Sequence, residues 1–303
     1  MSNGETGGRS HPDGGVAVAL ATPFRADGSL DTDGLERHVS RMVEGGVSVL
    51  MPCGTTGEGA TLTAQEQAQV VATCVEVSAG RVPVYAGAGT NSTAEARDLV
   101  QAAREAGADG ILSVVPFYNK PGPEGLFQHF QAVAEAARLP VMLYNVPGRT
   151  GTNMDAATTL RLAEVDGIMG VKEASGDLEQ VAAILARRPQ GFQVFAGDDA
   201  LTLPVLALGG EGVVSVAANQ VPHAMAEMVA EARADRWGRA RGILYRLLPL
   251  FEANFIESNP VPVKEALSMM GHMEPHVRLP LTPLGDASRT AVRRALAEAG
   301  VEA

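Results

Sequence analysis

The chain has 303 residues, of which 46% are hydrophobic and 19% are charged, and its formal net charge is −11. This composition is typical of a folded globular protein and excludes an intrinsically disordered one. Because no run of Lys and Arg could neutralise phosphates, and no apolar stretch approaches the ~18 residues of a membrane span, the sequence predicts no nucleic-acid partner and no membrane insertion.

The first residues are polar and rich in glycine, which predicts a disordered tail over residues 1–14. This segment lacks the charged-then-apolar pattern of a secretion signal, so we expect a cytoplasmic protein. The two cysteines, Cys53 and Cys74, are accompanied by no CxxC pair and no His/Cys cluster, so we expect no metal site.

Eight short apolar runs follow along the chain, each ending in Gly, Pro, Thr, Asn or Asp, as is typical of strands buried on both faces. They read VAVALATPF from Val16, VSVLMPCG from Val47, VPVYAGAG from Val82, GILSVVPFY from Gly110, PVMLYNVPGR from Pro140, GIMGVKEASG from Gly167, FQVFAGDD from Phe192 and GVVSVAAN from Gly212. Helical spacing fills the gaps, over residues 31–44, 63–78, 93–106, 123–137, 155–163, 177–186, 199–208 and 221–232.

This alternation predicts an α/β fold, a (β/α)8 TIM barrel over residues 15–235. A doubly wound open sheet is the alternative, but that fold usually carries a glycine fingerprint after its first strand, where this chain reads TPFRADGS. Helical patterns over residues 240–255, 262–270 and 286–300 follow with no strand between them. They predict a small C-terminal helical domain, residues 236–303.

In a barrel the active site lies at the carboxyl ends of the strands. The groups that the sequence places there are an amine, phenols, hydroxyls and a guanidinium, carried by Thr55, Thr56, Tyr118, Tyr144, Arg149 and Lys172. No histidine and no pair of carboxylates stands out among them, which argues against two-carboxylate hydrolysis and against metal-assisted chemistry. The set favours covalent catalysis by the amine.

Lys172 is the candidate nucleophile. It is one of three lysines, beside 21 arginines, and a lysine can lose its proton and form an imine whereas an arginine cannot. Strand alternation predicts that Ile168, Gly170 and Lys172 share one face, with Gly170 leaving space for a small ligand. The alternative is a strand-end lysine whose amine simply reaches water.

Three hydroxyls, those of Tyr144, Thr55 and Tyr118, fit a proton relay, because a hydroxyl both donates and accepts hydrogen bonds. The amides of Thr55 and Thr56 lie next to glycine and could approach a carboxylate, and Arg149 could bind a second carboxylate through two parallel hydrogen bonds. Each residue alone has a plainer explanation: a half-buried phenol, a turn threonine or a surface arginine.

The remaining polar residues of note are interpreted as structural. The Cys53 thiol precedes a glycine–threonine loop, but no histidine lies nearby in the sequence to act as its base. The pair Asp198–Asp199 is interpreted as a helix cap. Lys120 and Lys264 are expected to be solvated.

Four motifs resemble those of the dihydrodipicolinate synthase family: GTTGE from Gly54, YNVPGRTG from Tyr144, GVKEASGD from Gly170 and GDD from Gly197. This family is part of the pyruvate-dependent class I aldolase, or N-acetylneuraminate lyase, superfamily. The resemblance implies a lyase that condenses pyruvate with L-aspartate 4-semialdehyde to 4-hydroxy-tetrahydrodipicolinate, in the diaminopimelate route to lysine. It implies no cofactor, because the imine with pyruvate supplies the chemistry.

The resemblance also implies roles for the catalytic residues. Lys172 forms the Schiff base with pyruvate, Tyr144 donates and accepts protons, and Thr55 links Tyr144 to Tyr118 of a neighbouring subunit. The family is usually a homotetramer built from tight dimers, and the role of Tyr118 requires at least a dimer.

Substrate binding follows from the same resemblance: Thr56 and the backbone of Val214 hold pyruvate, and Arg149 binds the semialdehyde carboxylate. Sialic-acid lyase and 2-keto-3-deoxy-sugar acid aldolases are alternatives on the same barrel, but the paired threonines and Arg149 favour the synthase. A non-catalytic binding protein on this scaffold is a further alternative, which the full set of amine, phenols and threonines disfavours.

Many members of this family are inhibited by lysine at a subunit interface, and here we expect weak or absent inhibition. Asn91 and Glu95 fit that site, but Ala64 and Gln67 stand where histidine is familiar, and Phe117 replaces a tyrosine. A steady-state assay is therefore expected to show little effect of lysine. Half-inhibition at a sub-millimolar concentration is the result that contradicts this.

Overall fold

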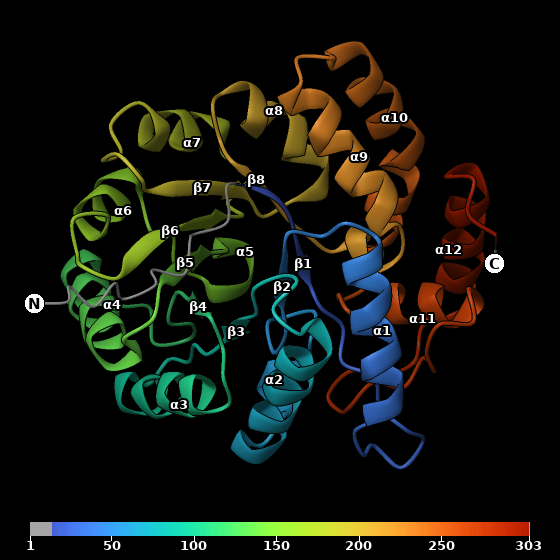
Figure 1. The fold of residues 1–303 in the computed structure, drawn as a ribbon, viewed down its shortest axis with the longest axis horizontal. Helices are drawn as coiled ribbons and strands as arrows, with labels where there is room; N and C mark the ends of the chain where they lie inside the picture. Colours follow the sequence, from blue (N-terminus) through green and yellow to red (C-terminus); the bar gives the residue numbers. More distant parts are fainter. Residues whose placement is uncertain (1–13, 303) are drawn as a thin grey trace, which may run out of the picture.

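The computed structural model of the chain describes residues 14–302, and its centre is a parallel sheet. The strands are β1 (Gly15–Ala19), β2 (Val49–Met51), β3 (Tyr85–Gly87), β4 (Gly110–Val114), β5 (Val141–Asn145), β6 (Ile168–Glu173), β7 (Gln193–Ala196) and β8 (Gly212–Ser215). Their spatial order is β2-β1-β8-β7-β6-β5-β4-β3, and an isolated parallel bridge between Leu50 and Val84 brings β2 to β3. The sheet closes on itself, which confirms the predicted (β/α)8 barrel (Figure 1).

Helices surround the sheet on the outside (Figure 1). Those of the barrel are α1 (Thr32–Glu44), α2 (Ala64–Ser78), α3 (Thr93–Glu105), α4 (Pro123–Ala137), α5 (Pro147–Thr150), α6 (Ala156–Leu162), α7 (Leu178–Leu185), α8 (Thr202–Ala207) and α9 (Pro222–Arg233). Short 3₁₀ turns are η1 (Gly59–Thr61), η2 (Asp199–Leu201) and η3 (Ala217–Asn219). The start of α2 shows why these helices begin where they do: Thr63 accepts from the Glu66 amide, and the Glu66 carboxylate accepts from the Thr63 amide.

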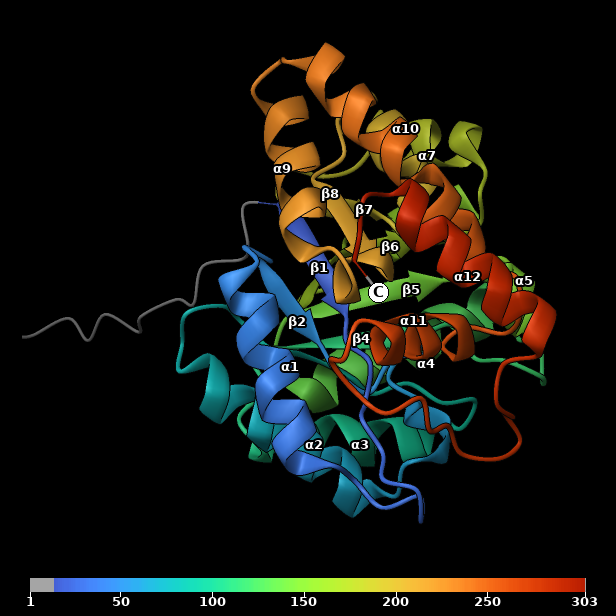
Figure 2. The same cartoon turned by 90° about the vertical axis from the view of Figure 1, so that its right-hand side faces the viewer.

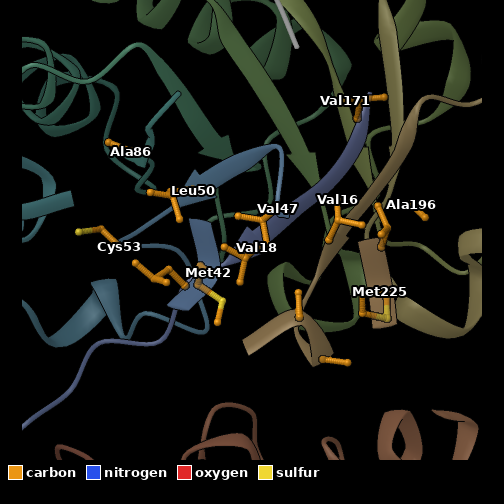
Figure 3. Close-up of a cluster of buried hydrophobic side chains, with 14 of the residues drawn as sticks. Val16, Val18, Met42, Val47, Leu50, Cys53, Ala86, Val171, Ala196 and Met225 are labelled. Carbon is orange, nitrogen blue, oxygen red and sulfur yellow. The ribbon is translucent and has the colours of Figure 1, made fainter. Parts of the chain in front are cut away.

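The strands bury apolar side chains on both faces, as their continuous hydrophobic runs predicted. One face contributes to a cluster inside the barrel, made of Ala17, Ala19, Val49, Met51, Tyr85, Leu112, Met142, Tyr144, Val146, Met169, Phe195 and Val214. The other face packs against the helices, where Met42 of α1 and Met225 of α9 meet strand residues such as Val18 (Figure 3). Because both faces of each strand are packed, the direction of the side chains at each strand end is fixed.

The face assignment along β6 was wrong at one residue. The pairing of β5 with β6 shifts register near the start of both strands, so that Met169 joins the inner cluster and Ile168 the outer one. The space beside Gly170 is also not left for a ligand, because a Cβ there would lie 2.4 Å from the backbone oxygen of Gln193. Gly170 therefore serves the close approach of β7 to β6.

The C-terminal region consists of α10 (Trp237–Ala253), α11 (Val261–Met269) and α12 (Asp286–Glu298). Helix α10 packs on α9 and α12, and α12 packs on α11 (Figure 2). A small cluster joins α11 to the carboxyl ends of β1 and β8, formed by Ala21, Val216, Val263, Leu267 and Met273. We propose that residues 15–235 form the barrel domain and residues 236–303 a C-terminal helical domain. The C-terminal domain reaches the carboxyl ends of the strands.

Three expectations from the sequence concern the N-terminal tail, membrane-spanning helices and metal-binding groups. The predicted tail, residues 1–14, lies outside the described residues except for Gly14. Between residues 14 and 302, no helix is both long enough and apolar enough to cross a membrane. The same range has no group of three or more His, Cys, Asp or Glu that could hold a metal ion.

Candidate active site

A cavity of about 990 Å³ opens where the carboxyl ends of β2 to β5 meet the C-terminal region. Thr55, Tyr144 and Arg149 line it, and Ser258, Asn259 and Pro260 close it from the side of α11. The structure thus brings together three of the predicted site residues from two strand ends, Thr55 after β2 and Tyr144 and Arg149 at and after the end of β5. The size of the cavity is sufficient for small carboxylic acids.

Lys172 lies directly against Tyr144. The two residues are register partners on β6 and β5, and the Nζ of Lys172 lies 4.2 Å from the centroid of the Tyr144 ring. Lys172 is 4% exposed, and residues 14–302 provide no hydrogen-bond or ion-pair partner for its amine. Because no anionic group in this range holds this amine in an ion pair, its Nζ is available to react with a substrate. The expectation of a solvated strand-end lysine does not apply.

The hydroxyls of Tyr144 and Thr55 have no hydrogen-bond partner within residues 14–302 either. Tyr144 is buried and Thr55 is half-buried, and neither hydroxyl forms a hydrogen bond to another group in the described chain. Both residues line the same cavity, which makes their hydroxyls available to a substrate or to another hydroxyl. The proton relay is therefore not closed within one chain.

Tyr118, the third member of the expected relay, lies away from the cavity. It is 85% exposed and does not line the cavity, although its neighbour Phe117 does. Its backbone has a φ of 72°, an unusual value for a residue with a side chain, so the loop after β4 turns this phenol outward at some cost. A single chain thus does not bring Tyr118 to Thr55.

Thr56 and Val214 are buried at the ends of β2 and β8. The Thr56 hydroxyl accepts a hydrogen bond from the Nδ2 of Asn259 at 3.0 Å, which leaves its proton free to be donated elsewhere. Val214 belongs to the inner cluster and pairs with Ala17 of β1. Neither residue is among those that line the cavity.

Arg149 lies in α5, the single turn that follows β5. Its side chain is exposed at the cavity wall and donates to the backbone oxygen of Asn259 at 3.4 Å. This one long hydrogen bond leaves most of the guanidinium donors available. Arg149 is thus a cationic group at the entrance, rather than an arginine on an unrelated surface.

Lys264 was expected to be solvated, and this was wrong. Its side chain is fully buried, and its Nζ donates to the Oε1 of Glu58 at 2.7 Å and to the backbone oxygen of Thr22 at 2.9 Å. Burial lowers the pKa of Lys264, and the charge of Glu58 acts in the opposite direction. The local sequence gives no clear signal of this burial, because Glu265 directly follows Lys264 in α11. Lys120, in contrast, is exposed as expected.

A second group that the sequence did not reveal lies behind the strands that carry Tyr144 and Lys172. Asn145 follows Tyr144 on β5 and Glu173 follows Lys172 on β6, and the Nδ2 of Asn145 donates to the Glu173 carboxylate at 3.0 Å. The Nε2 of Gln180 donates to the same carboxylate at 3.0 Å. These bonds hold the ends of β5 and β6 together on the side facing away from the barrel axis.

Two other candidates have structural roles. Burial raises the pKa of the Cys53 thiol to about 12, so a reactive thiolate is disfavoured there. Asp198 caps η2 through the Ala200 amide, as predicted. Asp199 instead accepts from the amides of Val216 and Ala217 at 3.1 and 2.9 Å, and burial raises its pKa to about 6. It therefore shapes the turn after β8.

The cavity continues toward the residues on which the expectation about lysine rests. Ala64, Gln67, Glu95 and Phe117 line its outer part, whereas Asn91 does not. The Gln67 amide is already engaged, since its Nε2 donates to the backbone oxygen of Gly59 at 3.0 Å. The structure thus brings four of the five positions to one cavity.

Comparison with known proteins agrees with this geometry. The model of the dihydrodipicolinate synthetase family matches residues 12–299. The chain is 50% identical over 291 residues to the 4-hydroxy-tetrahydrodipicolinate synthase of Koribacter versatilis (strain Ellin345), covering 95% of this chain and 96% of that protein.

Solved structures of similar proteins superpose over nearly the whole chain. Dihydrodipicolinate synthase from Thermotoga maritima matches with a TM-score of 0.93 and 40% identity, over 96% of this chain and 99% of that one. The chloride-inhibited dihydrodipicolinate synthase from Acinetobacter baumannii, complexed with pyruvate, matches with a TM-score of 0.93 and 43% identity, over 95% of this chain and 99% of that one. The chain belongs to the dihydrodipicolinate synthase family.

Proposed function

We propose that this chain is a 4-hydroxy-tetrahydrodipicolinate synthase, a lyase that condenses pyruvate with L-aspartate 4-semialdehyde in the diaminopimelate route to lysine. The observation that carries the proposal is the buried, unpaired amine of Lys172 against the Tyr144 ring beside a cavity of suitable size. The proposal is supported by membership of the family and by the 50% sequence identity to a 4-hydroxy-tetrahydrodipicolinate synthase. The reaction needs no cofactor, because the imine itself accepts electron density.

The proposed reaction begins with attack of the Lys172 Nζ on the keto carbon of pyruvate, and loss of water gives the protonated imine. A methyl proton then leaves, because its electron pair is delocalised onto the imine nitrogen, and an enamine results. The enamine carbon attacks the aldehyde carbon of the second substrate, and the new alkoxide takes up a proton. The amino group of that substrate then attacks the imine carbon, which closes the ring and releases the Lys172 amine.

Protons enter and leave these steps through hydroxyls. We assign Tyr144 as the donor and acceptor nearest to Lys172, with Thr55 linking it to Tyr118 of a partner subunit. The outward position of Tyr118 in the single chain supports this arrangement, since the phenol is free to reach another subunit. We accordingly propose a homo-oligomer, a tetramer of tight dimers.

Substrate carboxylates are assigned to two different groups. The Thr56 hydroxyl accepts from Asn259 and can donate its own proton to a substrate. Together with the backbone of Val214, it would bind pyruvate. Arg149 at the cavity entrance would bind the semialdehyde carboxylate, because a guanidinium offers two parallel donors to a carboxylate. The separation matches an order in which pyruvate binds deeper than the second substrate.

The test is reduction with borohydride in the presence of pyruvate, followed by digestion and mass spectrometry. We expect the peptide containing Lys172 to gain the mass of a reduced pyruvate adduct, and a Lys120→Arg variant to behave identically. An unmodified Lys172 peptide contradicts the proposal. A related sugar-acid aldolase would also be trapped, so an assay with aspartate semialdehyde, coupled to the reductase that consumes the product, decides between the two activities.

A further inference from the structure

The loop that follows β2, residues 54–58, carries both threonines of the proposed site and has an unusual backbone. It lies between two non-glycine residues in the left-handed region, Cys53 with a φ of 59° and Glu58 with a φ of 53°. The loop also folds back on itself so tightly that a Cβ at Gly59 would lie 2.0 Å from the Cys53 backbone oxygen. Such a conformation is unfavourable by itself and persists only where surrounding contacts hold it.

The contacts that hold this loop come from residues far away in the sequence. The Glu58 carboxylate is 1% exposed, accepts from Lys264 at 2.7 Å, and accepts from the Arg278 amide at 3.0 Å. The Lys264 amine also donates to the backbone oxygen of Thr22. The Thr22 hydroxyl in turn donates to the backbone oxygen of Gly57 at 2.7 Å. Three of these hydrogen bonds tie residues 57 and 58 to Thr22, in the loop after β1, and to the C-terminal region, and the fourth joins Lys264 to Thr22.

Helix α11 provides a firm base for this attachment. Its Val263 and Leu267 pack with Ala21 and Val216 at the ends of β1 and β8. Asn259, just before α11, donates to the Thr56 hydroxyl. The same short segment of the C-terminal region therefore contacts the loop at Thr56 and again at Glu58.

We propose that the Glu58–Lys264 ion pair is a positioning device for pyruvate: it fixes loop 54–58, and with it Thr55 and Thr56, to the C-terminal region. The proposal rests on the pyruvate chemistry proposed above. Glu58 lies in the cavity wall, but its two carboxylate oxygens are engaged by Lys264 and by the Arg278 amide, and Lys264 does not line the cavity, so we assign the pair no direct substrate contact. The directional bonds of the pair determine where the Thr56 hydroxyl and the loop amides lie, which an apolar contact would not do.

A positioning role of this ion pair can be distinguished from a contribution to stability by replacing both partners together. Replacing both partners with neutral side chains of similar size is often neutral for stability, because desolvation of the two charges offsets their attraction. Removing only one partner leaves a buried unpaired charge and is strongly destabilising. The double variant Glu58→Gln/Lys264→Met is therefore the informative change.

For this variant we expect a KM for pyruvate that is raised at least about tenfold, since small displacements of binding groups have large kinetic effects. The KM for the semialdehyde should stay within about twofold, because Arg149 lies on another loop. The rate of borohydride trapping should fall at low pyruvate and recover at saturating pyruvate. The melting temperature is measured alongside.

The matched control is the double variant Arg188→Met/Glu211→Gln. This pair has the same 2.7 Å separation but lies at the amino ends of β7 and β8, at the opposite end of the barrel. It should change neither KM. An unchanged KM for pyruvate in the Glu58/Lys264 variant overturns the proposal, and so does a parallel rise of both KM values with a loss of stability. If the unmodified protein cannot be trapped with pyruvate, the proposed function fails instead.

Discussion

Replacement of Lys172 by arginine is expected to abolish imine formation and to lower kcat/KM at least about 1,000-fold. Arginine keeps the positive charge beside the Tyr144 ring, but its guanidinium does not lose a proton in proteins and cannot attack a keto carbon. The variant therefore separates the positive charge from the nucleophilic amine that the proposed mechanism requires. The measurements are steady-state turnover in the coupled assay and borohydride trapping with pyruvate.

The effect of a larger side chain must be distinguished from the effect of losing the amine, because Lys172 is buried and arginine is larger. The variant Lys172→Met provides the control, since methionine is unbranched, of similar length and without an amine. Lys172→Met should retain a normal melting temperature, as the amine has no hydrogen-bond or ion-pair partner in residues 14–302 whose loss would be felt, and the melting temperature of Lys172→Arg shows what the larger side chain costs. Turnover within about tenfold of the unmodified enzyme in either folded variant contradicts the assignment of Lys172.

The variant Tyr144→Phe should lower kcat by a factor on the order of 100 to 10,000, the usual contribution of a general acid–base group. The ring that lies 4.2 Å from the Lys172 amine remains, so the surroundings of the nucleophile change little. The hydroxyl makes no hydrogen bond within the described chain, so its removal leaves no buried group unsatisfied and stability should be unchanged. Turnover, pyruvate trapping and the melting temperature are measured together.

Tyr85 offers a matched control for this variant. It is buried in the same inner cluster, on β3, but does not line the cavity. Tyr85→Phe should keep normal turnover, whereas Tyr144→Phe should still trap pyruvate at long incubation, only more slowly. Equal turnover of the two variants is inconsistent with a proton-transfer role for Tyr144.

The neighbourhood of Lys172 and Tyr144 was predictable because it depends on local patterns. Each residue ends an apolar run, and adjacent parallel strands bring such ends to one rim of the barrel. The one-residue register shift that moves Met169 inside was not predictable, because a bulge arises from how β5 fits β6 and leaves no mark on the hydrophobic run. The alternation rule was therefore right for Lys172 and wrong for Ile168.

The sequence by itself determined the barrel class, since strand and helix periodicities are properties of neighbouring residues, and it singled out Lys172 as the nucleophile that we propose. Only the tertiary structure decided the partners of Glu58 and Thr56, which are Lys264, 206 positions away, and Asn259, 203 positions away. A buried lysine and a solvated one look alike in a sequence, because burial is set by packing between distant segments. Those long-range contacts, rather than the motifs, place the threonines of the site.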